Sequence, residues 1–292
     1  MTLILAEIQN SHLSLPPIQE YETKELLSWG IEKMNISLYW SKGIKGTGIK
    51  IAIMDSGVNF NHPDLSTNIQ NGYNAINNKE LPIDDYGHGT MMTGIIGAKH
   101  NGIGIKGIAP DSKIYPVKVL DEFGEGRFIH IQKGIEWCID NDIDIINMSF
   151  AFPTDHPDLK SSIKKALDAG IIIVASVSNS YDGKSGFPAS YDGVIAVTSV
   201  DSSYQKGETA SLDDIDFAAP GVDVITTSND LKYQYVSGTS IATPHVTGMI
   251  ALLLQDASFN KSNLYEQLKA TSLDIGEKGY DSKFGWGFIK IK

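Results

Sequence analysis

Short apolar runs alternate with helical patterns along most of this chain, and this alternation constrains the fold more than any other feature. Between residues 50 and 228, runs rich in β-branched side chains are separated by segments with helical periodicity. The run at 171–175, Ile-Ile-Ile-Val-Ala, has no polar position, which indicates a strand covered on both faces. Strands that alternate with helices form parallel sheets through right-handed crossovers. The sequence therefore predicts an α/β fold of three layers, in which helices flank a central, mostly parallel β-sheet.

The expected elements can be assigned by residue range. The predicted strands are Ile51–Met54, Lys113–Leu120, Asp144–Phe150, Ile171–Val177 and Val194–Val200, and the predicted helices are His88–Lys99, Arg127–Asn141 and Pro157–Ala169. No repeat or low-complexity linker divides this region. We therefore expect one domain over residues 38–292, preceded by an N-terminal extension over residues 1–37.

A turn of small residues that leads into an apolar helix surrounds Ser240. The segment reads Gly-Thr-Ser-Ile-Ala-Thr-Pro-His-Val, and an apolar run follows at 249–254. A serine in the first turn of a helix lies beside backbone N–H groups that could stabilise a negatively charged oxygen. We place Pro244 in the same first turn, where the missing N–H of proline has little effect. Ser240 is therefore the candidate nucleophile.

A serine nucleophile needs a base, and His88 is the better of two candidates. His245 lies on the same helix but points about 140° away from Ser240, at about 100° per residue. His88 stands between two glycines ahead of a helix, in Asp-Tyr-Gly-His-Gly-Thr. Asp55 ends the apolar run Ile51–Met54, at the carboxyl end of a predicted strand, where α/β sheets place their sites. Asp55 could therefore orient the imidazole of His88.

Three blocks of this sequence resemble the signatures of the subtilisin-like serine proteases. They are Asp55-Ser-Gly, Gly-His88-Gly-Thr and Gly-Thr-Ser240-x-Ala-x-Pro-His, in the family order Asp, His, Ser. The resemblance runs from about residue 38 to the C-terminus and implies the subtilisin-like fold, a serine endopeptidase and a triad of Asp55, His88 and Ser240. It also implies Asn179, after the strand Ile171–Val177, as the side-chain donor to the oxyanion.

The walls of the implied substrate pocket depart from the family pattern. Where relatives commonly have Ser-Leu-Gly-Gly, this chain has Ser-Phe-Ala-Phe at 149–152, and Ser178 replaces a glycine before Asn179. The resemblance assigns substrate binding to Ser149, Phe150, Ala151, Ser176, Val177, Ser178 and Gly186. The extra Cβ atoms predict a narrower pocket and restricted specificity, unless the backbone shifts to keep the pocket open.

Two further departures lie beside the triad. Met91 and Met92 follow the histidine block, where packing in a helix explains them, and Ile241 replaces the methionine that usually follows the nucleophile. Without a thioether at that position, we expect tolerance of peroxide.

Calcium is the expected metal. The loop Asn101-Gly-Ile-Gly-Ile105 resembles the loop that binds a structural calcium in secreted relatives, and Asp64 matches the carboxylate ligand. The resemblance therefore implies Asp64, Asn101, Ile103 and Ile105 as ligands, since calcium takes six to eight oxygens, many of them carbonyls. The alternative is an ordinary glycine-rich turn. No pattern indicates an organic cofactor or a zinc site.

Composition and the first residues limit partners and location. The formal net charge of −11 argues against a nucleic-acid partner, which requires a basic surface. The single cysteine, Cys138, lies in a helical pattern and is expected to be buried. We find neither a signal peptide nor a membrane span, and expect a cytoplasmic protein similar to intracellular members of the family. The extension, with its proline-containing piece Leu13–Ile18, would be either a flexible or packed strap or an inhibitory arm across the cleft.

The expected partner is a peptide or protein substrate, and oligomeric state is left open. Within the protease hypothesis, general intracellular turnover competes with a maturation protease that removes the leader of a peptide antibiotic. A pseudoprotease that binds peptides without cutting them is a third hypothesis. An esterase is a fourth, although the chain lacks Gly-x-Ser-x-Gly after a strand.

Overall fold

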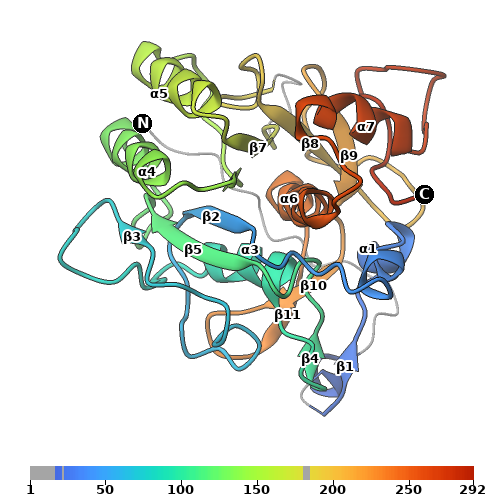
Figure 1. Ribbon diagram of the computed structural model, residues 1–292, viewed down its shortest axis with the longest axis horizontal. Coiled ribbons are helices and arrows are strands. Elements are labelled where there is room, and N and C mark those ends of the chain that lie inside the picture. The colour runs from blue at the N-terminus through green and yellow to red at the C-terminus, as the bar shows by residue number, and fades with distance from the viewer. Residues whose placement is uncertain (1–16, 22, 180–184) are drawn as a thin grey trace.

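A seven-stranded sheet in which every pairing is parallel forms the centre of the molecule (Figure 1). The computed structural model describes residues 17–21, 23–179 and 185–292. The strand order is β3-β5-β2-β6-β7-β8-β9. These strands are β3 (Tyr73–Asn74), β5 (Lys113–Lys118), β2 (Lys50–Asp55), β6 (Ile145–Met148), β7 (Ile172–Ser176), β8 (Ile195–Val200) and β9 (Phe217–Pro220).

The predicted strands and helices are confirmed, with ends that differ by a few residues at most. Most positions of β2, β6, β7 and β8 are apolar, and all positions except the first of β2 and the first of β7 are buried, as expected for strands covered on both faces. Because the strands are parallel, the residues that follow β2, β6 and β7 lie along one edge of the sheet. Asp55, Ser149 and Asn179 therefore come from adjacent positions along that edge.

Helices cover both faces of the sheet and confirm the three layers. On one face lie α3 (His88–Gly97) and α6 (Thr239–Gln255), which pack against each other, while α4 (Phe128–Asp140) and α5 (Pro157–Asp168) pack side by side on the other (Figure 1). Almost the whole of α3 and α6 is buried, whereas α4 and α5 bury one face each. The first pair therefore occupies the core, which gives α3 and α6 little freedom to move.

Smaller elements surround this core. Two-stranded sheets are formed by β1 (Glu25–Leu26) with β4 (Gly104–Ile105), which are parallel, and by the antiparallel hairpin of β10 (Val224–Thr227) and β11 (Tyr233–Val236). The short helices are η1 (Ile18–Glu20), α1 (Trp29–Lys33), α2 (Ser37–Trp40), η2 (Lys261–Asn263) and α7 (Leu264–Thr271). Among the described helices, none combines the length and the apolar character needed to cross a membrane.

The described part of the N-terminal extension packs against the body. Tyr21 is buried and its hydroxyl is 2.9 Å from the hydroxyl of Tyr235. Ile31, Met34 and Ile36 belong to the main core. Residues 1–16, which contain most of the proline-containing piece, lie outside the described residues. An inhibitory role for the extension stays a prediction.

Candidate active site

Asp55 and His88 meet at the carboxyl edge of the sheet. Asp55 is the last residue of β2, and His88 is the first residue of α3. The His88 Nδ1–H lies 2.9 Å from both Asp55 Oδ1 and Asp55 Oδ2, and both side chains are buried. The Ser56 N–H donates to Asp55 Oδ1 at 2.7 Å. Because the carboxylate takes Nδ1–H, the Nε2 atom is the one available as a base.

Opposing effects set the pKa of His88. Burial disfavours the charged imidazolium and lowers the pKa, but the charge of Asp55 and its hydrogen bond, helped by the charge of Asp84, outweigh burial and raise it. A raised pKa makes His88 a stronger proton acceptor.

A second buried carboxylate, Asp84, lies close to this pair. It was not identified from the sequence. Its oxygens accept hydrogen bonds from the backbone N–H groups of Gly87 and Thr90, at 2.7 and 2.8 Å, and from the Ser56 hydroxyl at 2.8 Å. Asp84 therefore caps the helix that carries His88. The position of an aspartate four residues before a helical pattern could have suggested this role.

Ser240 lies at the second residue of α6, as predicted, but Pro244 was misplaced. Pro244 is the sixth residue of α6, inside the helix rather than in its first turn. A proline there has no N–H to donate to the carbonyl four residues earlier, which is that of Ser240. The Ser149 hydroxyl donates to this carbonyl instead, at 2.9 Å. Ser149, which the sequence predicts as part of the pocket wall, therefore anchors the backbone of Ser240.

A buried network extends this anchor into the sheet. The Asn147 Nδ2–H donates to Ser149 Oγ at 2.9 Å, and the Thr247 hydroxyl donates to Asn147 Oδ1 at 2.8 Å. Asn147 lies on β6 and Thr247 on α6. The network therefore ties the start of α6 to the central sheet.

His88 Nε2 and Ser240 Oγ are both buried, and neither has a hydrogen-bond partner within the part of the chain that the structure describes. The structure thus joins Asp55 to His88 directly and places Ser240 on the neighbouring helix, without a bond between Ser240 and His88. Hydrogen bonds in active sites are often long in the free enzyme and tighten when substrate binds.

Asn179 follows β7 and faces the start of α6. Its Oδ1 atom accepts hydrogen bonds from the Thr239 N–H at 3.2 Å and from the Thr239 hydroxyl at 3.1 Å. Since these bonds hold the oxygen of the amide, the Nδ2 group is the part that could donate to a substrate oxygen.

The predicted pocket walls come together after β6 and β7. Phe152 and Phe187 exchange backbone hydrogen bonds of 2.7 and 2.8 Å, which holds the segment after Ser149 against Gly186. A Cβ atom on Gly186 would lie only 2.7 Å from the Cβ of Ala151. Ser149, Phe150, Ala151, Ser176, Val177 and Ser178 are all buried. Gly186 therefore lies against Ala151, and position 186 has no room for a side chain.

The four predicted calcium ligands lie in one region, but hydrogen bonds among themselves hold them. Asp64 Oδ1 accepts from Asn101 Nδ2–H at 3.0 Å, and Asp64 Oδ2 accepts from the Ile105 N–H at 3.1 Å. The Asn101 Oδ1 atom accepts from the Ile103 N–H at 3.1 Å. Nitrogen donors rather than carbonyl oxygens thus face the carboxylate, and this arrangement does not fit a calcium ion. Among the described residues there is also no cluster of three or more His, Cys, Asp or Glu side chains suited to a metal.

The two other groups considered from the sequence are inert. His245 Nδ1–H donates to the Ile241 carbonyl at 2.9 Å, and burial lowers the pKa of His245 to about 4, so the ring is neutral. Cys138 is fully buried, and burial raises its pKa. Neither group contacts Asp55, His88 or Ser240 through a hydrogen bond in the described residues.

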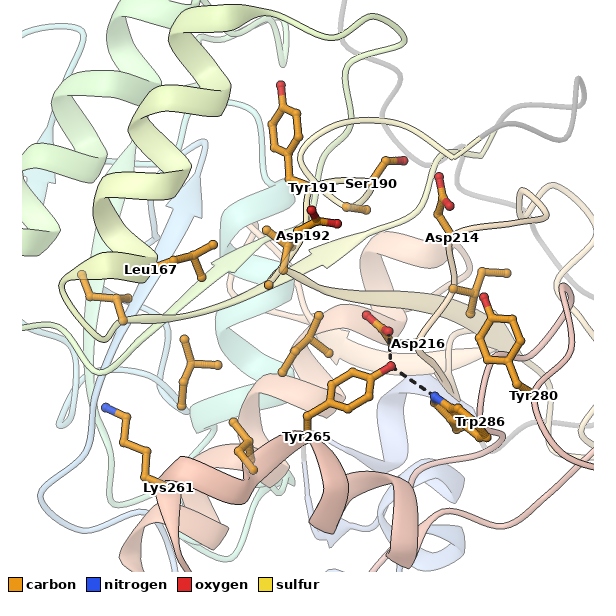
Figure 2. Close-up of a pocket in the computed structure, with 18 of the residues that line it drawn as sticks. Leu167, Ser190, Tyr191, Asp192, Asp214, Asp216, Lys261, Tyr265, Tyr280 and Trp286 are labelled. Atoms are coloured by element: carbon orange, nitrogen blue, oxygen red, sulfur yellow. Dashed lines mark hydrogen bonds between the residues drawn. The ribbon is translucent and has the colours of Figure 1, made fainter.

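A cavity of about 870 Å³ lies at the opposite edge of the sheet (Figure 2). It is lined by residues at the amino ends of β7, β8 and β9 and by α7. Figure 2 shows the Tyr265 hydroxyl between Asp216, to which it donates at 2.5 Å, and the Trp286 Nε1–H, from which it accepts at 3.2 Å. Burial raises the pKa of Asp216. This cavity is separate from the edge that holds Asp55 and His88.

Comparisons with known proteins agree with this geometry. Residues 46–287 match the model of the Subtilase family. The chain is 36% identical over 271 residues to a subtilisin of Bacillus pumilus, which covers 90% of this chain and 97% of the relative. It is 35% identical over 295 residues to subtilisin NAT of Bacillus subtilis subsp. natto, covering 99% of this chain and 74% of the relative.

A third relative is longer. The chain is 41% identical over 270 residues to the minor extracellular protease Epr of Bacillus subtilis strain 168, which covers 90% of this chain but only 41% of that protein. All three alignments extend over most of the sequence described above. The chain therefore belongs to the subtilase family and is a subtilisin-like serine protease.

Proposed function

We propose that this serine endopeptidase cleaves peptide bonds with Asp55, His88 and Ser240 as its triad. Ser240 Oγ attacks the scissile carbonyl carbon while His88 Nε2 takes the hydroxyl proton. His88 then donates this proton to the leaving amine, and water hydrolyses the acyl-enzyme with His88 again as the base. Asp55 holds the Nδ1–H tautomer and stabilises the imidazolium. The Ser240 N–H and Asn179 Nδ2–H stabilise the oxyanion.

One observation carries the proposal most strongly. The hydrogen bonds from His88 to Asp55 leave Nε2 as a buried base, and Ser240 Oγ is a buried hydroxyl on the helix packed beside it; neither atom has a hydrogen-bond partner among residues 17–21, 23–179 and 185–292. Unpaired polar atoms in a protein interior cost free energy, so the presence of these two indicates a functional role.

Labelling and substitution test the assignment. A fluorophosphonate probe should modify Ser240 in the parent, and Ser240→Ala should abolish both labelling and cleavage of a chromogenic peptide without changing the circular dichroism spectrum. Ser112→Ala is the matched control, because Ser112 is a buried serine whose hydroxyl bonds to Gly46. A parent that labels at another residue, or full activity in Ser240→Ala, would exclude this triad. A parent that neither labels nor cleaves would favour the pseudoprotease.

Restricted specificity is supported by the contact of Ala151 with the Gly186 backbone region. Ala151→Gly should raise kcat/KM for a large residue before the scissile bond relative to alanine at that position. An unchanged ratio would mean that the pocket is already open. Dedicated removal of a peptide-antibiotic leader and general protein turnover can be separated with casein, which a dedicated processing enzyme should barely cleave.

Two further statements stay predictions. A structural calcium at Asp64, Asn101, Ile103 and Ile105 would require the loop to turn its carbonyls inward, and a melting temperature that rises with calcium relative to EDTA would support it. The cytoplasmic location also stays a prediction, and cell fractionation would test it.

A further inference from the structure

Asp84 is the most heavily hydrogen-bonded side chain near the triad, although it does not touch Asp55 or His88 through a hydrogen bond. It is only 4% exposed. Its Oδ1 atom accepts from Ser56 Oγ–H, Tyr86 N–H and Gly87 N–H at 2.8, 3.1 and 2.7 Å. Its Oδ2 atom accepts from the N–H and the hydroxyl of Thr90 at 2.8 and 2.6 Å. Five donors from two separate segments thus converge on one buried carboxylate.

Ser56 links Asp84 to the two segments that carry Asp55 and His88. Its hydroxyl donates to Asp84 and accepts from the Gly89 N–H at 2.9 Å, while its backbone N–H donates to Asp55 Oδ1 at 2.7 Å. The hydroxyl thus contacts the residue that follows His88, and the backbone N–H contacts the residue that precedes Ser56. One side chain therefore connects the end of β2 with the first turn of α3.

The backbone after β2 and the backbone at the start of α3 are also packed so closely that neither can shift independently of the other. A Cβ atom on Gly89 would lie 2.1 Å from the carbonyl oxygen of Gly57, so the backbones after β2 and at the start of α3 touch directly. Gly87, the residue before α3, has a φ of 105°, which favours glycine. The position of His88 relative to Asp55 is therefore set by this junction rather than by the two side chains alone.

We propose that Asp84, acting through Ser56, is a positioning residue for the general base. The inference rests on the triad of the proposed function. Asp84 holds the start of α3 and the residue after β2 in one register, so that His88 Nδ1 meets both oxygens of Asp55 and Nε2 is left to take the proton of Ser240. Its negative charge also favours the imidazolium formed during catalysis.

The charged groups around His88 allow the electrostatic part to be isolated. Asp55 on β2 and Asp84 in the preceding loop are the charges that act on His88. A cation also bonds to this junction: Lys118 of β5 donates to the Ser56 carbonyl at 2.7 Å and pairs with Asp85 at 2.6 Å. Removing the charge of Asp84 should therefore lower the pKa of His88, with Asp55 still present.

Ser56→Ala is the principal variant because it keeps the charge and the helix cap of Asp84. It removes only the link, so kcat should fall by about 10- to 100-fold, the order expected for a displaced general base, while KM changes by less than about threefold. The control, Ser112→Ala, removes an equally buried hydroxyl outside the site and should stay within about twofold of the parent.

Asp84→Asn tests the electrostatic role through the pH dependence of activity, which a purely structural role would leave unchanged. It should shift the acid limb of the kcat/KM profile to lower pH, whereas Ser56→Ala should leave the midpoint of that limb in place. The His88 pKa can be read independently by NMR in the inactive Ser240→Ala protein. If Asp84→Asn fails to fold, Ser56→Ala decides alone.

The outcomes separate this inference from the assignment of the triad. Ser56→Ala with parental kcat, or a folded Asp84→Asn with an unchanged His88 pKa, would overturn the positioning role. If His88→Ala and Ser240→Ala kept activity, the triad itself would be wrong. Loss of activity in those two variants but not in Ser56→Ala would reject only the role of Asp84.

Discussion

Replacing Ser149 by alanine should destabilise the protein although it removes a single oxygen atom. The Ser149 hydroxyl donates to the Ser240 carbonyl and accepts from Asn147 Nδ2–H, and all three residues are buried. Ser149→Ala leaves one buried acceptor and one buried donor without these partners, each at about 1–3 kcal/mol. The two losses together predict about 2–6 kcal/mol less free energy of unfolding, or roughly 3–10 °C in melting temperature for a domain of this size.

Pro244 provides an internal test of the cause. The Ser240 carbonyl needs Ser149 only because Pro244 has no N–H to donate to it. In Pro244→Ala the new N–H can make the ordinary helical bond to Ser240. The substitution should therefore be more favourable by about 1 kcal/mol in the Ser149→Ala protein than in the parent.

The measurement is differential scanning calorimetry of the four proteins of this cycle. All four should carry Ser240→Ala, which prevents self-digestion and keeps the backbone carbonyl in question. If Pro244→Ala changes the melting temperature equally with and without Ser149, the hydroxyl does not replace the missing N–H and the reasoning is wrong.

Two further predictions concern the chemistry around Ser240. Burial opposes protonation of His88, but Asp55 and Asp84 raise its pKa; because the neutral ring is the base, activity should fall as the pH drops through a midpoint above about 6.5. A kcat/KM profile from pH 5 to 9 checks this, and an acid limb centred below 6.5 would contradict it. Ile241→Met should lose activity in hydrogen peroxide faster than the parent, with a mass increase of one oxygen, because a thioether there can form a sulfoxide. Equal inactivation of the two proteins would show that residue 241 does not control peroxide sensitivity.

The central strands could be predicted because their own residues determine them. Continuous apolar runs produced the predictions for β2, β6, β7 and β8, and the structure confirms them. The edge strand β9 was missed, since Phe-Ala-Ala-Pro is short and ends in proline. Distant residues hold it in place: Ala218 N–H donates to the Gly287 carbonyl, and Ile289 N–H donates to the Ala218 carbonyl, both at 2.9 Å. Contacts of this kind leave no local pattern.

The sequence was sufficient to predict which residues form the site, but not all of the contacts between them. The sequence indicated Asp55 and His88, and the structure joins them. It did not reveal that Ser149 would bond to the carbonyl of Ser240, because that bond depends on the place of Pro244 within the helix. Asp84 was missed for a similar reason, since the turn around it brings donors from two separate segments to one carboxylate. The roles assigned to Asn179 and the pocket walls await the experiments above.

The C-terminal residues are tied to the segment that follows α1. The Ile291 N–H donates to the Met34 carbonyl, and the Asn35 side chain donates to the Ile291 carbonyl, both at 2.9 Å, so that the C-terminus lies beside α1 (Figure 1). Residues 34–291 thus form a nearly closed ring of polypeptide. Removal of Ile291 and Lys292 would break both of these hydrogen bonds and should therefore loosen the segment that follows α1.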